Sequence, residues 1–346
     1  MCRHFSRLFS ILIVCFSISS PNATEKPFQT NFVSNAAELY QAVQKANRSR
    51  SGTDIVLAAG RYSITQRLQL IGSHISLKSL SGDPKTVILS GRGMKKTNTT
   101  EILIDVSGSH ISLSGFTLEQ SANHLIQVRA ENNADNFTLS NCVLRDSYEQ
   151  LLKVSAAHTD EAAYADNGRI KNCSFEYTAG IGPQFYIGGI DAHRSRNWTV
   201  DGNTFKNIAS PSKHVAEHAI HFWGKSSNIT VINNTIEDCD RGIGFGLGHD
   251  PIKQTNGGLI ENNVIRSTNL SHPYADAGII LEASPNVQII RNQIYIETSY
   301  PNAIEYRFAA TKNILIKDNI TDKSIVSRDG GQAKLSGNQN LVYLSK

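Results

Sequence analysis

A short segment recurs along the chain about every 30 residues, and it constrains the fold more than any other feature. Each copy begins with an aliphatic residue, and most copies have Gly, Asn or Asp at the third position and Asn or Cys at the fourth, as in VINNTI (231–236). The fourth position is occupied in turn by Phe116, Cys142, Cys173, Asn203, Asn234, Asn263, Asn292, Asn319 and Asn338. The spacing drifts between copies, which indicates units with a constant core and loops of variable length.

Every unit also contains a second strand-like piece in which apolar residues alternate. These pieces are LIQVR (125–129), LLKVS (151–155), GIDAH (189–193), AIHFW (219–223), GIGFG (242–246), GIILE (278–282), AIEYR (303–307) and SIVSR (324–328). Short strands repeating with this period predict an all-β fold, a parallel β-helix in which each coil pairs with the next. The recurring Asn then lies inside and forms a ladder, because an amide donates to one coil and accepts from another.

Cys142 and Cys173 replace Asn in two adjacent units, so we expect them in the same internal column. Side chains of parallel strands do not point toward each other, which favours buried free thiols over a disulfide. The bridged alternative stays open at this point. The chain has no C-x-x-C motif, so a zinc ribbon or a thioredoxin-like site has no support.

The first residues are typical of a secretory signal peptide. Arg3 and Arg7 precede an apolar run over 8–18, and small residues follow it. We therefore predict a signal peptide over 1–23, a secreted or periplasmic location, and a single β-helix domain over 24–346. The apolar run is too short for a membrane span, and no membrane span is expected later in the chain.

Residues 35–47 have the pattern of an amphipathic helix. Asn35 and Glu38 form a capping box, and Leu39 and Val43 belong to the apolar stripe that follows at helical spacing. An open end of a β-helix would expose a strand edge that pairs with other chains. We expect this N-terminal helix to cap the first coil.

The charge balance gives no reason to expect a nucleic-acid partner. The chain has 34 Lys and Arg against 30 Asp and Glu, and loss of Arg3 and Arg7 with the signal peptide brings the two counts closer. Nucleic-acid-binding domains carry a clear basic excess, which is missing here.

The expected protein is a monomer.

The segment AAELYQAVQKANRSRSGTDIVLAAGRYSI (36–64) resembles the opening of chondroitinase B-like and alginate lyase-like polysaccharide lyases and of many secreted β-helix proteins. From about Phe32 onward, the chain is similar to the pectate lyase-like right-handed β-helix superfamily. This resemblance implies a right-handed solenoid and a polysaccharide as the partner. It does not decide the reaction, because the superfamily includes lyases, hydrolases, epimerases and binding proteins.

Functional side chains should point outward from the second strand of each unit, between the inner apolar residues. Reactive residue types converge there on the middle and later units. The candidate catalytic residues are Asp191, His193, His221, Glu282, Glu305 and Arg307, and the candidate substrate-binding residues are Arg194, Trp223, Arg241 and Arg328.

Stacking of the units predicts which of these residues are neighbours. Asp191 should lie beside His221, and Glu282 beside Arg307, one coil apart. The alternating glycines of 242–248 lie between the two pairs and should leave a shallow floor for a sugar ring. An ordinary solvated ion pair is the competing explanation for the Glu–Arg pair.

The favoured function is a polysaccharide lyase that cleaves an acidic, uronate-containing glycan by β-elimination. This reaction needs a cation to neutralise the carboxylate, a base for the adjacent proton and an acid for the leaving oxygen. Arg194, Arg307 or Arg328 supplies the cation. His193 or His221 supplies the base or acid, with Asp191 orienting one imidazole. Ca²⁺ held by Asp191, Glu282 or Glu305 is one alternative to the arginine, and no other cofactor is implied.

Two other function classes stay open. A glycoside hydrolase would use a carboxylate pair drawn from Asp191, Glu282 and Glu305, although the paired Asp and Gly-His-Gly element of the superfamily's hydrolases is not matched. A non-catalytic glycan-binding or surface protein would spread aromatic residues along the strip, where only Trp223 is clearly placed. The arginine–proline signature of pectate lyases is also absent, which argues against pectate as the substrate.

Overall fold

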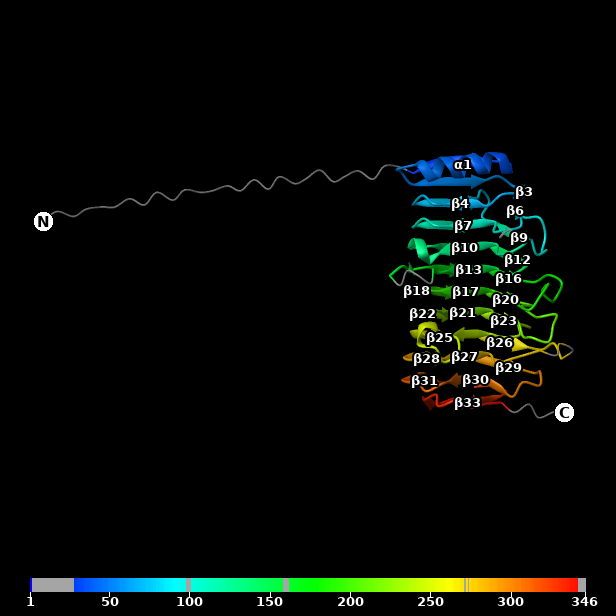
Figure 1. The fold of residues 1–346 in the computed structure, drawn as a ribbon, viewed down its shortest axis with the longest axis vertical. Helices are drawn as coiled ribbons and strands as arrows, with labels where there is room; N and C mark the ends of the chain where they lie inside the picture. The colour runs from blue at the N-terminus through cyan, green and yellow to red at the C-terminus, as the bar shows by residue number, and fades with distance from the viewer. Residues whose placement is uncertain (2–27, 98–100, 158–161, 271, 273, 342–346) are drawn as a thin grey trace.

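The chain folds into a column of stacked coils whose strands form three parallel sheets, A, B and C (Figure 1). The computed structural model describes residues 1, 28–97, 101–157, 162–270, 272 and 274–341. The predicted signal peptide falls almost entirely outside these ranges. Each coil gives one strand to each sheet in turn, and every strand pairs in parallel with the equivalent strands of neighbouring coils.

Sheet A contains the first strand of each coil. In spatial order it consists of β1 (Gln29–Val33), β2 (Thr53–Leu57), β5 (Ile75–Ser79), β8 (Ile111–Ser114), β11 (Thr138–Ser140), β15 (Arg169–Lys171), β19 (Thr199–Asp201), β22 (Ser226–Ile232), β25 (Thr255–Glu261), β28 (Val287–Ile290), β31 (Ile314–Lys317) and β34 (Ala333–Ser336), with β14 (Ala165–Asp166) and β18 (Ser195–Arg196) beside them.

Sheet B follows sheet A across a tight turn in each coil. It consists of β3 (Gly60–Ser63), β6 (Val87–Ser90), β9 (Thr117–Ser121), β12 (Val143–Ser147), β16 (Ser174–Glu176), β20 (Thr204–Lys206), β23 (Thr235–Glu237), β26 (Val264–Ser267), β29 (Gln293–Ile296), β32 (Ile320–Thr321) and β35 (Gln339–Asn340).

Sheet C carries the second strand-like piece of each unit. It consists of β4 (Leu68–Leu70), β7 (Ile104–Val106), β10 (Ile126–Arg129), β13 (Leu152–Ser155), β17 (Ile190–His193), β21 (Ile220–Trp223), β24 (Ile243–Phe245), β27 (Ile279–Glu282), β30 (Asn302–Arg307) and β33 (Ser324–Arg328). Two short 3-10 helices, η1 (Ala130–Asn132) and η2 (Pro251–Lys253), follow β10 and β24. This architecture confirms the predicted all-β, right-handed parallel β-helix.

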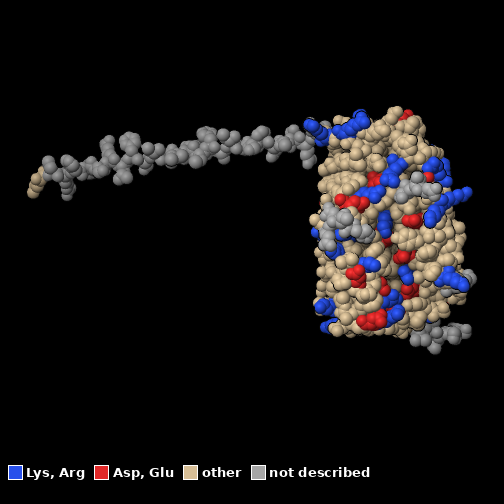
Figure 2. All heavy atoms as spheres, viewed as in Figure 1, with Lys and Arg blue, Asp and Glu red and all other residues tan. Residues whose placement is uncertain are grey.

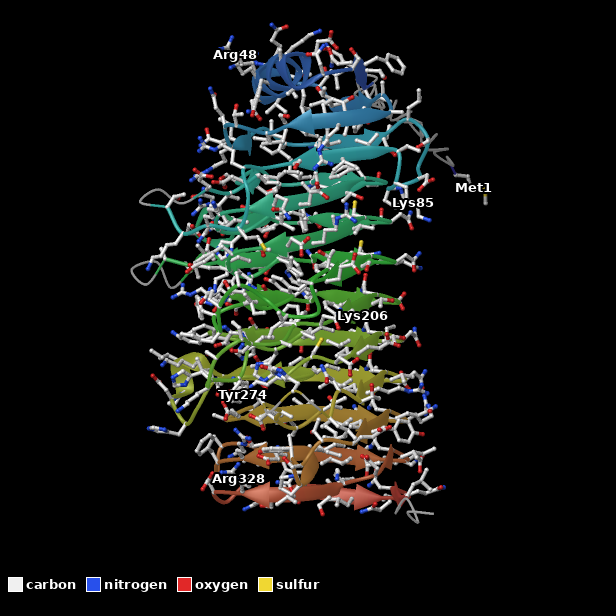
Figure 3. All side chains as sticks on the ribbon, turned by 90° about the vertical axis from the view of Figure 1, so that its right-hand side faces the viewer. Met1, Arg48, Lys85, Lys206, Tyr274 and Arg328 are labelled. Carbon is white, nitrogen blue, oxygen red and sulfur yellow. The ribbon has the colours of Figure 1, made fainter. Side chains whose placement is uncertain are left out.

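Helix α1 (Ala36–Arg48) lies across the first coil at one end of the column (Figures 1 and 3). The Asn35 side chain accepts a hydrogen bond from the Glu38 N–H at 3.0 Å, which satisfies one free donor of the first turn. Leu39 and Val43 are buried together with two alanines of the same stripe. The helix predicted over 35–47 therefore forms, and its apolar face packs on the first strands.

The predicted Asn ladder fills the turn between sheets A and B. Asn203 Nδ2 donates to Asn234 Oδ1 at 3.0 Å, and Asn234 Nδ2 donates to Asn263 Oδ1 at 3.0 Å. The same Oδ1 atoms also accept from the backbone N–H one coil earlier, and the pattern continues to Asn338. Each rung from Asn234 to Asn338 therefore satisfies two donors of the preceding coil, and Asn203 satisfies one.

The residue before each ladder position adopts the left-handed conformation, with φ of 66° at Gly202 and 58° at Asn233. Gly and Asn tolerate this region best, which explains their recurrence at the third position of the repeat.

Cys142 and Cys173 occupy the same internal column, where the Cys142 N–H donates to the Cys173 Sγ at 3.4 Å. Both thiols are buried and free, as the side-chain geometry predicted. Burial raises the pKa of the Cys173 thiol far above its ordinary value, with the neighbouring Cys142 thiol acting in the same direction. Cys173 is therefore a protonated, inert thiol, and both cysteines belong to the core.

Replacement of one ladder residue should lower stability by leaving its neighbours without partners. Asn234→Leu removes the acceptor of two Asn203 donors and the donor to the Val200 carbonyl. We expect a loss of about 1–3 kcal/mol in the free energy of unfolding, measured by denaturant titration. Asn256→Leu, at an exposed position of β25, is the control and should change stability by less than about 0.5 kcal/mol. An equal loss of unfolding free energy in the two variants would show that a ladder Asn stabilises the fold no more than an exposed Asn does.

Candidate functional site

The outer face of sheet C presents two columns of side chains set by the strand register. The first column includes Lys153, Asp191 and His221, which are direct neighbours on β13, β17 and β21. In the second, Glu282 of β27 is paired with Arg307 of β30. Charged side chains gather down the middle of the face shown in Figure 2. The predicted adjacency of Asp191 with His221 and of Glu282 with Arg307 is therefore correct.

The first column is not exposed, contrary to the expectation from strand alternation. Asp191 retains 3% of its surface, His221 2% and Glu305 0%. Loops that lead into sheet C lie over this column. Tyr300 donates to Glu305 Oε1 at 2.8 Å, and the His218 ring occupies the space above Gly244. The predicted empty floor at the 242–248 glycines is thus partly filled by an imidazole.

A buried ion pair forms the centre of the first column. Lys153 Nζ binds Asp191 Oδ2, and Trp223 Nε1 donates to Asp191 Oδ1 at 2.6 Å. Burial acts to raise the pKa of Asp191, but Lys153, His193 and His221 outweigh it and hold this pKa well below the ordinary value. Asp191 is therefore an ionised anchor for the groups around it.

His193 lies at the rim of this buried pair and lines a hollow of about 130 Å³. Its Nε2 is 3.1 Å from Lys153 Nζ, and its side chain keeps 16% of its surface exposed. The Trp223 ring lies against it, with 4.0 Å between the ring centroids. The hollow also includes Arg194 and Lys253. Two of the four predicted substrate-binding residues, Arg194 and Trp223, therefore lie here with His193.

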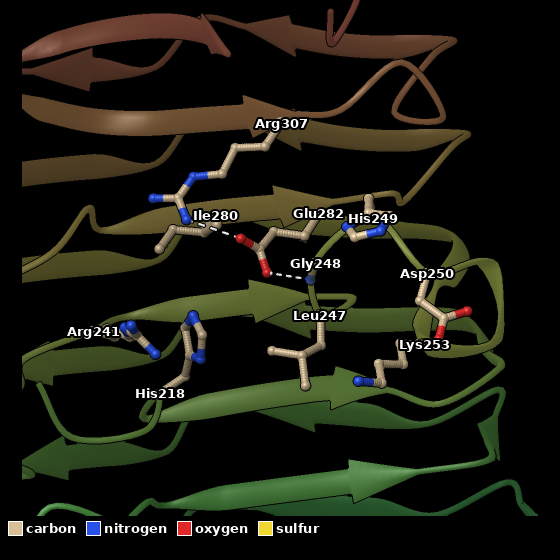
Figure 4. A pocket seen from close by; sticks show the side chains of 10 residues that line it. All are labelled: His218, Arg241, Leu247, Gly248, His249, Asp250, Lys253, Ile280, Glu282 and Arg307. Carbon is tan, nitrogen blue, oxygen red and sulfur yellow. Dashed lines mark hydrogen bonds and ion pairs between the residues drawn. The ribbon is translucent and has the colours of Figure 1, made fainter. Parts of the chain in front are cut away.

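A second, larger hollow of about 330 Å³ lies further along the same face (Figure 4). Its lining consists of His218, Arg241, Leu247, Gly248, His249, Asp250, Lys253, Ile280, Glu282 and Arg307. Figure 4 shows His218 and Arg241 on one side and Lys253 on the other. Lys253 of η2 lines both hollows, so it marks where they meet.

Arg307 belongs to a network of acidic side chains rather than standing alone. It pairs with Glu282 at 2.9 Å, with Asp276 at 3.4 Å and with Glu305. Burial lowers the pKa of Arg307, but Asp276 and the two glutamates outweigh it and raise the pKa further above its ordinary value. The charge of Arg307 is thus already balanced by protein carboxylates.

Glu305 is held from several sides. Its Oε2 accepts from Arg307 and from Arg328, the latter at 3.0 Å, and its Oε1 accepts from Asn302 at 2.7 Å. Burial raises the pKa of Glu305, but the hydrogen bonds from Asn302, Tyr300 and Arg307 prevail and the pKa is lowered. Glu305 and Arg328 therefore join the last coils to one another.

The carboxylates considered for Ca²⁺ do not fit that ion. Asp191 is bound by Lys153 and Trp223, and Glu305 by its arginine and amide donors. Glu282 accepts from Arg307 and, at 2.7 Å, from the Gly248 N–H. Their oxygens face N–H donors instead of a shared point. Within the described ranges these three carboxylates form no common cation site.

Three residues important for this geometry are absent from the predicted site: Lys153, His218 and Lys253. Lys153 stands in the first column, so its position beside Asp191 follows from the register. His218 lies in a loop and Lys253 in η2, which belongs to the connection between β24 and β25, and no spacing rule relates such residues to the strand that they cover. Among the described residues, no helix is long and apolar enough to cross a membrane.

Solved structures share this fold at low sequence identity. The surface protein and adhesin PfbA of Streptococcus pneumoniae aligns with a TM-score of 0.62 at 14% identity, covering 88% of this chain and 93% of its own. An alginate lyase from a Paenibacillus species aligns with a TM-score of 0.59 at 14% identity, covering 90% of this chain and 99% of its own. A polygalacturonase from Erwinia carotovora aligns with a TM-score of 0.52 at 15% identity, covering 91% of this chain and 100% of its own. At such identities the likeness establishes the fold alone.

Comparison with curated proteins gave no match. The sequence model described as "Right handed beta helix region" matches residues 99–342. Because this match spans more than half of the chain, the protein belongs to the right-handed β-helix family.

Proposed function

We propose that this protein is a polysaccharide lyase that cleaves an acidic, uronate-containing glycan by β-elimination. The observation that carries this function is the junction at Lys253, where the hollow with His193 and Trp223 meets the larger hollow. A sugar at this junction would have an aromatic surface, an imidazole and a lysine within one binding site. Those are the groups that recognition and β-elimination of a uronate require.

The charges around the two hollows favour an anionic ligand. Arg194, Lys225, Arg241 and Lys253 are among the residues that line them, against Asp250 and Glu282. Lys253 forms no ion pair with any residue that the structure describes. Arg307, one of the arginines considered for the uronate carboxylate, is balanced by three carboxylates of the protein. Lys253 therefore replaces Arg307 as the proposed carboxylate-binding residue.

His193 supplies the proton transfers in this proposal, and Lys153 is its hydrogen-bond partner in the free protein. Their nitrogens are 3.1 Å apart, so an ammonium donor and an imidazole acceptor share one hydrogen bond. The substrate takes the place of Lys153 at His193 Nε2, and this nitrogen accepts the proton beside the uronate carboxylate. The resulting imidazolium then gives that proton to the leaving oxygen as the glycosidic bond breaks. Asp191 is a positioning residue, because it holds Lys153 and Trp223 in place without reaching the hollow.

Loss of the His193 imidazole should reduce turnover far more than stability. His193→Ala should lower the rate of unsaturated uronate formation by about 10²-fold or more, followed by ultraviolet absorbance over a panel of acidic glycans. The melting temperature should hardly change, because the side chain lies at the rim. His110→Asn, in a turn before sheet A, is the matched control and should keep full turnover. Unchanged turnover in His193→Ala would exclude this residue as the base.

Loss of the Lys253 charge should weaken binding rather than chemistry. Lys253→Ala should raise KM for an acidic glycan by about 10-fold and leave kcat nearly unchanged, since one charge-assisted contact is removed. Steady-state kinetics measure both constants. Lys85→Ala, at an exposed position on another face, should leave both unchanged. A fall in kcat with constant KM would assign Lys253 to the chemical step instead.

The same variants separate lyase activity from the two alternative functions. A hydrolase would release reducing ends without any unsaturated product, and Glu282→Gln would be its most damaging change, because Glu282 is the one predicted carboxylate that lines a hollow. A binding protein would form no product, and Trp223→Ala would cause the largest loss of affinity.

The site of action belongs to the same proposal. Polysaccharides of this kind lie outside the cell, and the signal peptide predicted over 1–23 would send the chain there, as a secreted or periplasmic monomer.

A further inference from the structure

Three potential metal ligands meet beside β21, at the edge of the larger hollow. The ring nitrogens of His218 and His221 and a carboxylate oxygen of Glu217 all lie within 4.8 Å of one another. His221 belongs to β21, and the other two residues come from the segment that leads into that strand. This is the one group of its kind within the described ranges.

His218 is buried without any hydrogen-bond partner. It retains 5% of its surface, and neither Nδ1 nor Nε2 contacts a donor or acceptor. A neutral imidazole offers a lone pair on one ring nitrogen, and this is the form that binds a metal.

The fold makes room for this unsatisfied ring. A Cβ atom on Gly244 would lie 2.5 Å from His218 Nε2, so the missing side chain at Gly244 is what admits the imidazole. Buried polar groups without partners are rare, because burial costs them their hydrogen bonds to water. The position of His218 therefore calls for a partner that the described residues do not provide.

His221 has the hydrogen bonding of a metal-bound histidine. Its Nε2 is 2.9 Å from the Gly246 carbonyl oxygen and donates to it, which leaves the lone pair on Nδ1. Nδ1 is 4.0 Å from the Glu217 carboxylate and 3.9 Å from that of Asp191. A backbone carbonyl that fixes one ring nitrogen so that the other binds metal is a recurring arrangement in zinc sites.

We propose that Glu217, His218 and His221 bind one divalent transition-metal ion of the Zn²⁺ class. Two neutral imidazoles and one carboxylate are donors that suit Zn²⁺, whereas Ca²⁺ prefers an all-oxygen set. Bonds of about 2.0–2.1 Å would draw the three ligand atoms together to roughly 3.3 Å.

Glu217 has the freedom to make this movement. Its side chain keeps 26% of its surface exposed. In the structure the Glu217 carboxylate lies 3.9 Å from the Arg241 guanidinium. A bound metal ion would replace Arg241 as the cationic partner of this carboxylate. The remaining coordination position would face the larger hollow, which His218 lines. This metal site goes beyond the proposed lyase function and does not depend on it.

The test uses the full chain, without an added histidine tag, after treatment with a chelator. Titration with Zn²⁺ in a calorimeter should show one equivalent bound, and Zn²⁺ should raise the melting temperature. Co²⁺ should bind at the same site with the visible absorption of a four- or five-coordinate ion. Ca²⁺ should neither bind at this site nor raise the melting temperature. These readouts need no glycan, so they are independent of whether the protein is a lyase.

Two variants connect the binding to the named residues. His218→Leu should weaken Zn²⁺ binding by at least about 100-fold, and it should melt no lower than the metal-free native chain, because an unsatisfied polar ring is replaced by an apolar one. His249→Ala, which changes another histidine of the same hollow, should bind Zn²⁺ as the native chain does. Absence of saturable Zn²⁺ binding below about 1 mM, or equal binding by His218→Leu and the native chain, would overturn the site.

Discussion

Hydrogen bonding between one coil and the next determines where every functional side chain of this protein lies. Parallel pairing sets the register in all three sheets, and the ladder from Asn203 to Asn338 repeats that register at the turn between sheets A and B. A slip of one residue would take each ladder carboxamide away from two buried donors. Residues about 30 positions apart therefore stack directly, and the columns on sheet C follow from this.

A fixed register also forces polar residues of sheet C into covered positions, where each must find a partner. Asp191 meets Lys153 and Trp223, and Glu305 meets two arginines, an amide and a phenol. These groups hold neighbouring coils together from within the face. Contact with a ligand is left to the rim, where His193 and Lys253 line the hollows. His218 departs from this rule, because its ring nitrogens have no hydrogen-bond partner among the residues that the structure describes.

The parts of the structure that the sequence predicts are those determined by local signals or by the repeat. The capping box at Asn35 predicts α1, and the repeat predicts the ladder and the pairing of Asp191 with His221. Exposure of the first column was predicted wrongly, because it depends on loops whose lengths have no period. Tyr300 and His218 arrive from such loops and cover strands to which no fixed spacing relates them. The same reason explains why Lys253 was missed.

The two hollows differ in how their charges are balanced, and this difference determines where an anionic ligand would bind. Around Arg307, the carboxylates of Asp276, Glu282 and Glu305 offset the guanidinium, so that wall of the larger hollow attracts an anion weakly. Lys253 has no such partner within the described residues. A uronate would therefore be drawn to the junction of the hollows, beside His193 and Trp223. Binding there leaves the ion pairs of the last coils intact, so ligand and fold do not compete for the same charges.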